Sequence, residues 1–255
     1  MYKISANTLF VGKNLVFVPE CHSTNTIAMD LSQRESTIEG TVVITDNQHS
    51  GRGQRGNRWV SEPGKNLTFS LILKPAFLRP DQQFRLTMVI SLAIADYAKS
   101  KFPDSVKIKW PNDVLVKERK ICGILIENSL SGDTIQSAVV GIGFNINQTS
   151  FPNLKATSIK QETGKDYTLE DELPLLLQAI EERYVQLRDG RINLLENDYL
   201  TNLYRKGEWH AFNTKAGALP GMIEGVDQRG RLIVQTSEGK QYYDLKEISF
   251  AEKDR

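Results

Sequence analysis

Five short segments of the chain carry side chains that could bind or activate a ligand, and the most unusual is GRGQRGNRW at residues 51–59. Its glycines allow the backbone N–H groups to come close to an anion. Its arginines add fixed positive charge that suits phosphate or carboxylate, and Trp59 adds a flat apolar wall. A nucleotide-binding loop is typically built this way, although a solvated basic turn beside a core tryptophan would have the same composition. The spacing matches neither a P-loop nor a dinucleotide-binding motif.

Two further segments place single charged residues beside apolar strands. In KIKWPNDVLV, Pro111 restrains Trp110 to an extended conformation, so Asn112 and Asp113 are expected at a turn where they could face a ligand or Mg²⁺. In RKICGILIE, Lys120 opens an apolar strand near Gly123. Taken locally, a polar turn and a lysine that extends along the surface to solvent explain these segments equally well.

The remaining two segments are GIGFNIN and ECHSTN. Gly141 and Gly143 in a strand permit close approach of a ligand or of another backbone, and Asn145 follows them. The residues Ser23 to Asn25 stand at the expected start of a helix, where their side chains could cap the helix or bind the polar head of a small molecule. Each segment also has a purely structural explanation, so none of the five decides the function alone.

The bulk composition excludes several classes of function. The chain has 255 residues with 32 basic and 31 acidic side chains, so a general polyanion binder is not indicated and any anion recognition must be local. Cys21 and Cys122 form no C-x-x-C pair, which favours a reduced, cytoplasmic chain without a disulfide framework or a zinc site. The N-terminal residues do not read as a signal peptide, and no segment is long and apolar enough to span a bilayer.

Hydrophobic periodicity and turn residues predict the elements that must position these segments. Strands are expected at 14–20, 40–48, 66–75, 106–110 and 137–147, with a hairpin over 113–127 that turns at 117–119. Helices are expected from Ser23 or Thr24, over 79–102 with a cap near Asp81, over 168–187 with Thr168 and Asp171 as an acidic capping box, and over 193–206 ending at Gly207. Beyond this point only short strands are predicted, so we expect a domain boundary near residue 206.

The order and spacing of the five segments carry more information than any one of them. Together the motifs STN, GRGxRGxxW, KWPND, RKxxGILxE and GxGxNxN resemble the biotin–protein ligase family over roughly residues 15–150. The resemblance implies an α+β fold with a mixed sheet, akin to class II aminoacyl-tRNA synthetases, over residues 1–206. It also implies a small C-terminal SH3-like β-barrel over residues 207–255.

Such ligases use ATP, with Mg²⁺, to convert biotin into biotinyl-5′-AMP, and then transfer the biotinyl group to a lysine of a biotin carboxyl carrier domain. By this resemblance Arg52 and Lys120 are the cations that let two acids approach, and Asp113 holds Mg²⁺ or orients the incoming amine. The residues implied for biotin binding are Ser23, Thr24, Asn25, Gln48, Gly51, Arg52, Lys120 and Gly123. Those implied for ATP or adenylate binding are Arg55, Trp59, Asn112 and Asn145. The loop 51–59 is then expected to be a lid over the adenylate.

The chain departs from many bacterial relatives at Gln54, where those relatives carry arginine, and we hypothesise that Arg55 or Arg58 compensates. Some relatives are also DNA-binding repressors, but that activity needs an N-terminal helix-turn-helix, and the 22 residues before Ser23 predict strand and turn. Lipoate attachment and nucleotide binding without turnover are the other rival functions. A monomer and a homodimer are both compatible with the resemblance.

Overall fold

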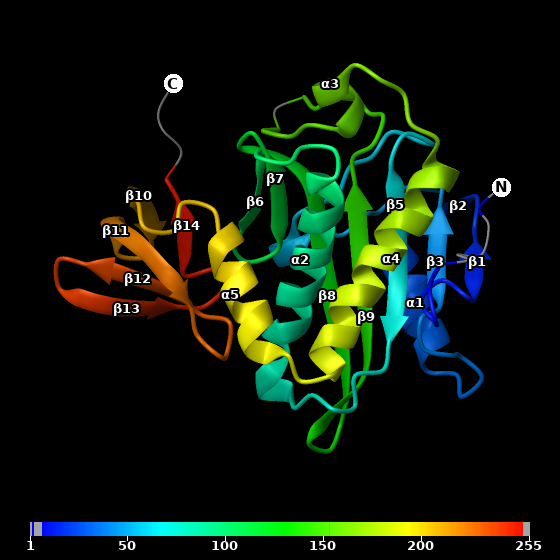
Figure 1. Cartoon of the computed structure of the whole chain (residues 1–255), viewed down its shortest axis with the longest axis horizontal. Coiled ribbons are helices and arrows are strands. Elements are labelled where there is room, and N and C mark those ends of the chain that lie inside the picture. The colour runs from blue at the N-terminus through cyan, green and yellow to red at the C-terminus, as the bar shows by residue number, and fades with distance from the viewer. Residues whose placement is uncertain (1, 3–6, 153, 252–255) are drawn as a thin grey trace.

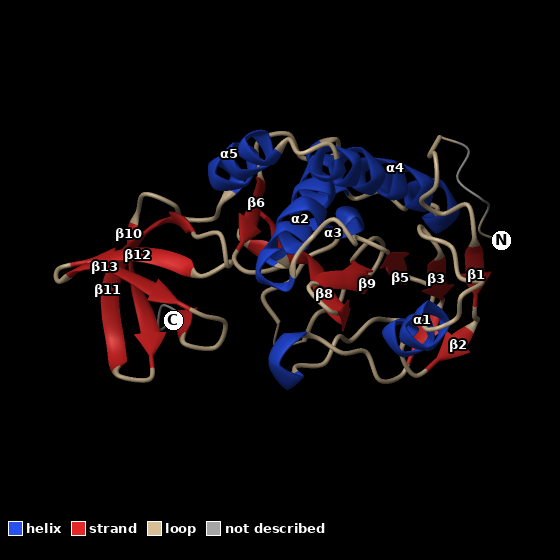
Figure 2. Cartoon of the chain, turned by 90° about the horizontal axis from the view of Figure 1, so that it is seen from below, coloured by secondary structure: helices blue, strands red, loops and turns tan. Residues whose placement is uncertain are grey.

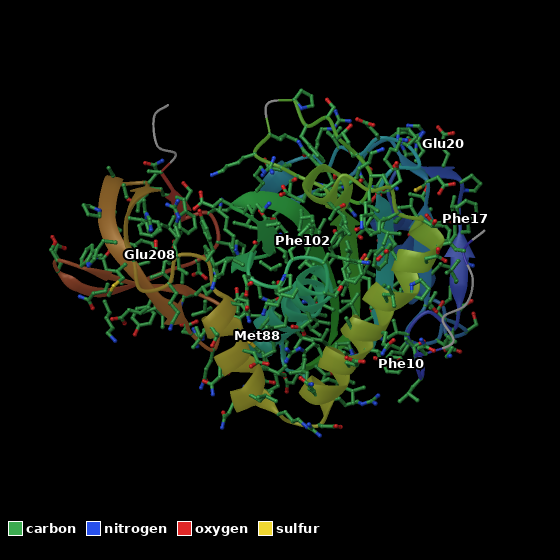
Figure 3. The ribbon with its side chains drawn as sticks, turned by 45° about the horizontal axis from the view of Figure 1, so that its top comes forward. Phe10, Phe17, Glu20, Met88, Phe102 and Glu208 are labelled. Carbon is green, nitrogen blue, oxygen red and sulfur yellow. The ribbon has the colours of Figure 1, made fainter. Side chains whose placement is uncertain are left out.

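The computed structural model describes residues 2, 7–152 and 154–251, which form a large mixed sheet with helices and a smaller antiparallel sheet (Figure 1). Within the part of the chain that is described, no helix combines the length and apolar character needed to cross a membrane. Figure 3 shows Phe10 and Phe17 at the end of the molecule that carries the N-terminal segment and Glu208 toward the opposite end.

The large sheet has seven strands, in which one neighbouring pair is parallel and the other neighbours are antiparallel. In spatial order the strands are β1 (Leu15–Phe17), β3 (Val42–Thr45), β5 (Leu67–Leu73), β9 (Thr134–Phe144), β8 (Arg119–Ser131), β7 (Asp113–Val116) and β6 (Val106–Lys109). The parallel pair is β1 and β3. A separate two-stranded sheet joins β2 (Glu20–Cys21) to β4 (Asn47–Gln48). The expected mixed sheet is therefore confirmed.

Helices cover the two faces of the large sheet unequally, as Figure 2 shows. One face carries α2 (Phe84–Lys99), α4 (Leu169–Arg188) and α5 (Ile192–Asn202), and the other carries α1 (Thr24–Ser32). The predicted central helix is α2: eleven of its 16 residues are buried, among them Met88, because apolar residues surround most of its axis. The main hydrophobic core therefore lies between α2, α4 and the sheet.

The α1 face of the sheet holds a much smaller core. Ala28 of α1 packs there with Val43, Ile72 and Val139, one residue from each of the strands β3, β5 and β9. Because side chains alternate along a strand, residues two positions from Ile72 and Val139 point to the same face. The residues singled out in the sequence come together on this same face of the sheet, next to the residues that pack against α1.

The C-terminal part is an antiparallel sheet, as expected from its short strands. In spatial order its strands are β13 (Gly239–Tyr243), β12 (Leu232–Thr236), β11 (Gly217–Val226), β10 (Trp209–Thr214) and β14 (Ile248–Phe250). Among the described residues, no backbone pairing joins the two outer strands β13 and β14. The all-β character is confirmed, whereas the closed barrel that the resemblance implied is not seen.

The N-cap position predicted for α4 was right, but several other details predicted for the helices were wrong. Thr168 is the N-cap of α4, but its side chain makes no capping hydrogen bond, so the capping box is absent. Asp81 lies in the 3-10 turn η2 (Pro80–Gln82) and pairs with Arg79, while α2 begins at Phe84. The short helix α3 (Ile159–Thr163), capped by Ser158, was not predicted.

The helix expected to end at Gly207 stops at Asn202. The residues that follow pair with strands instead: Leu203 forms a bridge with Ile108 of β6, and Lys206 forms one with Ile223 of β11. These tertiary contacts outweigh the helical pattern of the local sequence. The segment 203–206 thus joins the two sheets.

A second junction between the two parts is formed by Trp110 and Gly230. The indole Nε1 of Trp110 donates to the carbonyl oxygen of Gly230 at 2.9 Å, and this contact is buried. Gly230 has a φ of 89°, and a Cβ placed on it would lie 2.5 Å from the ring of Phe84 in α2. Only glycine allows the turn to adopt this backbone conformation and to approach α2 so closely.

We predict that Gly230→Ala destabilises the chain more than Gly207→Ala does. Gly207 has a similar φ of 80° but no atom within 4 Å of an added Cβ, so its variant reports backbone strain alone, about 1–3 kcal/mol. Gly230→Ala adds overpacking against Phe84, which costs roughly another 1–3 kcal/mol. Urea unfolding of both variants measures the difference. Equal free energies of unfolding would show that the Phe84 contact imposes no packing constraint.

Candidate functional site

The floor of the site is a row of four residues that runs across four strands of the large sheet. Thr68 of β5 is opposite Gly143 of β9, Gly143 is opposite Gly123 of β8, and Gly123 is opposite Asp113 of β7. In the next row on the same face, Ser70 is opposite Gly141, and Gly141 is opposite Leu125. The sheet therefore presents bare backbone at three positions, with polar side chains on both sides.

The glycines are required because other groups lie directly on the strands. A Cβ on Gly143 would come within 2.2 Å of the Trp59 indole, and one on Gly141 would come within 2.2 Å of the Asn25 amide oxygen. A Cβ on Gly123 would lie 3.0 Å from the end of the Lys120 side chain. This explains why the two glycines of GIGFNIN lie in a strand: they allow close approach, as the sequence analysis proposed.

A cleft that is partly open to solvent lies above this floor. About 460 Å³ at this place is free of protein atoms, the adjoining open solvent included. Most of the residues that the sequence singled out line the cleft, although they come from distant parts of the chain. They are Ser23, Thr24, Asn25, Gln48, Arg52, Trp59, Asn112, Lys120 and Gly123. The rest of the lining includes Gln54, Thr68, Ile124, Leu125, Gly141 and Gly143.

The loop 51–59 forms a small hairpin over the cleft. Arg52 and Arg58 form an antiparallel bridge, Trp59 N donates to Gly51 O at 2.9 Å, and Gly53 N donates to Asn57 O at 2.7 Å. Its tip is the 3-10 turn η1 (Gln54–Gly56), in which Gly56 has a φ of 83°. The glycines thus serve two purposes here, since Gly56 makes the turn and Gly51 allows close approach to the Gln48 side chain.

Trp59 lies against the glycines of the floor. Its ring is next to Gly143 and Gly123, and the ammonium of Lys120 is 5.5 Å from the ring centroid. The indole N–H is buried and makes no hydrogen bond. An unsatisfied buried donor costs about 1–3 kcal/mol, so the Trp59 side chain is held less firmly here than a fully hydrogen-bonded one would be. A ligand could therefore displace it from this position.

Arg52 is paired with a carboxylate that the sequence analysis did not assign. Its guanidinium donates to Glu127 of β8 at 2.9 Å, and the same Glu127 oxygen accepts from Asn25 Nδ2 at 2.8 Å. The Arg52 and Glu127 side chains are 47% and 30% exposed, so the pair is weak and easily exchanged. Glu127 therefore connects the loop 51–59 to the start of α1.

Lys120 is paired in the same way with Asp113, whose carboxylate lies 2.7 Å from the Lys120 ammonium. The two side chains are 34% and 25% exposed. The predicted cation and the predicted carboxylate thus meet at one end of the glycine row. In the absence of a ligand, each of the two cleft cations, Arg52 and Lys120, has a carboxylate partner.

A buried polar network lies at the other end of the cleft, at the start of α1. Thr24 N donates to the Gln48 side-chain oxygen at 2.9 Å. The Ser70 hydroxyl lies 2.8 Å from Thr24 Oγ1 and 2.5 Å from Asn25 Oδ1, so its one proton can serve only one of them at a time. Ser23 is the N-cap residue of α1 but makes no side-chain cap, so its hydroxyl remains available to the cleft. These groups can recognise a small polar head.

The other predicted residues lie at the margin of the cleft or outside it. Asn112 lines the cleft, but its amide already donates to Ile124 O. Gly51 lines a neighbouring hollow with Glu127. Asn145 is buried, is absent from the described lining of the cleft, and donates to Thr157 O at 3.0 Å, while its Oδ1 has no partner. The side chain of Arg55 lies outside the described part of the chain.

The position that carries Gln54 borders the cleft, so the departure from the family pattern falls at the site itself. Arg58, one of the two arginines expected to compensate, is exposed and donates to the carbonyl oxygen of His49 at 3.3 Å. It is absent from the described lining of the main cleft. Compensation by Arg55 or Arg58 stays a prediction.

The residues present do not form a dedicated metal site. No group of three or more His, Cys, Asp or Glu side chains in the described residues could hold a metal ion. Asp113 is paired with Lys120, and the adjacent Asn112 amide is used by Ile124. One carboxylate suits a Mg²⁺ ion that arrives on ATP phosphates, because Mg²⁺ is commonly held by one or two carboxylates plus phosphate oxygens.

Sequence reasoning missed two residues in particular that the structure brings into the site. Ser70 and Glu127 both contact Asn25. Ser70 alternates with Thr68 inside an otherwise apolar strand, and this period-two polar pattern was a signal that could have been read. Glu127 closes the motif RKICGILIE, but its partners are 75 and 102 residues away in the chain.

A second groove adjoins the cleft at Asn112, Ile124 and Gln54. Its remaining lining comes from the start of α2, from β8 and from the C-terminal sheet. These residues are Gln83, Phe84, Thr87, Ile126, Asn128, Arg229, Gly230, Asp244 and Leu245. The C-terminal part therefore borders a surface that is continuous with the site.

Two family profiles match most of the chain between them. The profile of the Biotin/lipoate A/B protein ligase family matches residues 18–145, and the profile of the Biotin protein ligase C terminal domain matches residues 212–252. A "Bifunctional ligase/repressor BirA" from Bacillus spizizenii is 31% identical, over 93% of this chain and 74% of that protein. A "Biotin--[acetyl-CoA-carboxylase] ligase" from Paracoccus denitrificans is 33% identical, over 89% of this chain and 97% of that protein.

Among solved structures, a biotin protein ligase from Aquifex aeolicus in complex with biotin and ATP superposes with a TM-score of 0.78 at 28% identity. The superposition covers 94% of this chain and 100% of that one. The family profiles, the relatives and the fold thus agree with one another. The chain belongs to the biotin/lipoate A/B protein ligase family.

Proposed function

We propose that the chain is an ATP-dependent ligase that activates biotin as biotinyl-5′-AMP and transfers it to a lysine of a biotin carboxyl carrier domain. One observation carries the proposal: Arg52 and Lys120, 68 positions apart in the sequence, line the same cleft above the glycine floor. The named relatives support biotin as the acid. The boundary near residue 206, between a catalytic part and a C-terminal part, belongs to this proposal.

The first step requires two anions to meet. A carboxylate oxygen of biotin forms a bond to the α-phosphorus of ATP, and the bond from that phosphorus to the β-bridging oxygen breaks, so pyrophosphate leaves. Two unit charges 4 Å apart repel by about 1 kcal/mol in water and by about 4 kcal/mol where the effective dielectric constant is near 20. Arg52 and Lys120 offset this repulsion when they exchange Glu127 and Asp113 for the substrate oxygens.

In the second step the lysine amine of the carrier attacks the acyl carbon, and the bond from that carbon to the AMP oxygen breaks. The amine loses a proton to water as the amide forms. We assign Asp113 the role of orienting the incoming amine. Asp113 would hold a Mg²⁺ ion together with the ATP phosphates, and the bound ion would screen their negative charge.

The polar network at the start of α1 is proposed to bind the biotin head. Thr24, Asn25, Gln48 and Ser70 offer donors and acceptors that converge at one end of the cleft. Ser23 completes this end, while Gly51 borders the neighbouring hollow and Gly123 lies toward Lys120, where the biotin carboxylate is expected. The fused rings of biotin then take the bare floor that Trp59 covers in this structure. Trp59 moves to stack on the adenine, the end of the ligand to which Asn112, Asn145 and Arg55 are also assigned.

The groove beside the C-terminal sheet is proposed to receive the carrier domain. It joins the cleft at Asn112 and Ile124, which gives a lysine side chain a route to the acyl carbon. Phe84 and Leu245 offer apolar contacts for the methylene groups of that side chain. The loop 51–59 then covers the adenylate from the other side and limits its hydrolysis.

Lipoate activation is the rival function, because the family profile covers both biotin and lipoate ligases. The polar groups around Asn25 and Gln48 favour biotin, whose ureido ring has hydrogen-bonding groups that the dithiolane of lipoate lacks. Pyrophosphate release measured with each acid separately distinguishes the two. Release with lipoate and not with biotin would replace the proposed substrate.

We predict that Lys120→Ala and Arg52→Ala each slow the first step by about 10²–10³-fold, because a positioned charge is lost where negative charge builds up. Lys240→Ala is the control: its ammonium forms an exposed ion pair with Glu224 on the C-terminal sheet. Biotin-dependent exchange of labelled pyrophosphate into ATP measures the step. Unchanged exchange in both cleft variants would contradict the charge-neutralisation mechanism.

We also predict that Gly143→Ala weakens biotin binding by about tenfold or more, or roughly 1.4 kcal/mol, because the added methyl group occupies the floor. Gly225→Ala is the control, since its methyl group would meet only Leu200 at 3.2 Å, outside the cleft. Titration calorimetry with biotin gives the affinities, and thermal unfolding shows whether both variants remain folded. Equal affinities in a folded Gly143→Ala variant would mean that biotin does not use this floor.

A further inference from the structure

Glu162 of α3 is a buried carboxylate that the proposed reaction does not use. Its side chain is 2% exposed, yet it lies among three donors. The Thr157 hydroxyl donates to it at 2.6 Å, the Lys117 ammonium is 3.2 Å away, and the Arg119 guanidinium donates to it as well. A buried charge with this many partners is kept only where they offset the cost of leaving water.

The partners of Glu162 keep it ionised. Burial by itself raises the pKa of Glu162, but the hydrogen bonds from Thr157 and Lys117 and the charge of Arg119 outweigh burial, so its pKa lies below the usual range for a glutamate. The carboxylate is therefore charged at neutral pH. Its negative charge is available to fix the two cations next to it.

Those two cations belong to the turn that precedes Lys120: Lys117 lies within it and Arg119 follows it. Lys117 and Glu118 have φ values of 47° and 65°, a conformation that residues other than glycine rarely adopt. The turn is held on both sides: Glu162 binds Lys117 and Arg119, while Glu118 accepts from Tyr204 at 3.0 Å and from Arg205 at 3.3 Å. Without such contacts a two-residue turn of this kind would favour glycine or asparagine.

The third partner of Glu162 fixes the backbone of Lys120 itself. Lys120 N donates to Lys155 O at 2.9 Å, and Thr157 N donates to Lys120 O at 2.9 Å. Residues 155–157 therefore pair with Lys120 as a short strand would. Because Glu162 accepts from the Thr157 hydroxyl, it holds this segment and the hairpin turn together, one on each side of Lys120.

We propose that Glu162 is a positioning residue for Lys120, which fixes the β7–β8 turn and the segment 155–157 so that the Lys120 ammonium lies beside Asp113 in the cleft. The inference rests on the proposed function, in which Lys120 neutralises charge in the first step. A displacement of about 1 Å at a reacting group can slow a reaction by about 10²-fold, so a residue outside the cleft can have this effect. The groups around Asn25 and Gln48 are not part of this network.

Glu162→Gln keeps the size of the side chain and an acceptor for Thr157, but it loses the charge that binds Lys117 and Arg119. We expect kcat of biotin-dependent pyrophosphate exchange to fall by about tenfold or more and KM for biotin to change by less than about threefold. Glu172→Gln is the matched control. Glu172 is also buried, at 8% exposure, with Lys101 at 3.0 Å and Tyr97 at 2.5 Å, but it lies between α2 and α4. The variant Glu172→Gln is expected to lower Tm without lowering kcat.

A double-mutant cycle with Lys120→Ala separates positioning from general stability. If Glu162 acts through Lys120, adding Glu162→Gln to Lys120→Ala changes the residual exchange by less than about twofold. If the two losses multiply, Glu162 acts independently of Lys120 and the inference is wrong. A fall in kcat of Glu172→Gln equal to that of Glu162→Gln would also overturn it.

Arg119→Met provides a second variant should Glu162→Gln not fold. The Arg119 side chain is 37% exposed. Its removal leaves no buried charge unpaired, because Lys117 and Thr157 still bind Glu162. A smaller fall in kcat of the same kind is expected, and an unchanged kcat counts against the inference. Absence of biotin-dependent exchange in the unmodified chain would instead reject the proposed function, so the two failures are distinguishable.

Discussion

Gly123 and Gly143 lie opposite each other on β8 and β9, so two neighbouring strands present bare backbone at one point of the sheet face. A sheet face normally carries a side chain at every second residue, and no flat ring can rest on the backbone there. With Thr68 on one side and Asp113 on the other, the glycines leave a strip that is polar at both ends and open in the middle. The position of Trp59 and the free space of the cleft both depend on this strip.

The charges around the strip are already paired, and this affects the energetics of ligand binding. Arg52 is bound to Glu127 and Lys120 to Asp113. An incoming carboxylate or phosphate therefore exchanges one ion pair for another instead of desolvating a bare cation. Because these side chains remain partly exposed, each pair is weak and the exchange is inexpensive. Glu127 and Asp113 thus hold the cations at the cleft without competing strongly for them.

The sequence predicted most of the elements and most of the cleft, because the motifs combine local turn signals with residue types that are rarely placed together. It failed where the deciding contact lies far away in the chain. The end of α5 is set by bridges from Leu203 and Lys206 to other strands. The capping box at Thr168 is a local failure, because its pattern is present but the Thr168 side chain makes no capping hydrogen bond. Glu127 and Ser70 were missed because the residues that they contact lie far away in the chain. The assignment of Asn145 to the ligand stays a prediction, since its amide donates to Thr157 while its Oδ1 has no partner.

The contact between Trp110 and Gly230 has a mechanical consequence. Trp110 comes two residues before Asn112 and three before Asp113, and its indole holds a turn of the C-terminal sheet. The segment 110–113 therefore contacts the C-terminal sheet at one of its ends and carries, at the other, the carboxylate that pairs with Lys120, so the position of that sheet and the position of Asp113 are constrained by the same four residues.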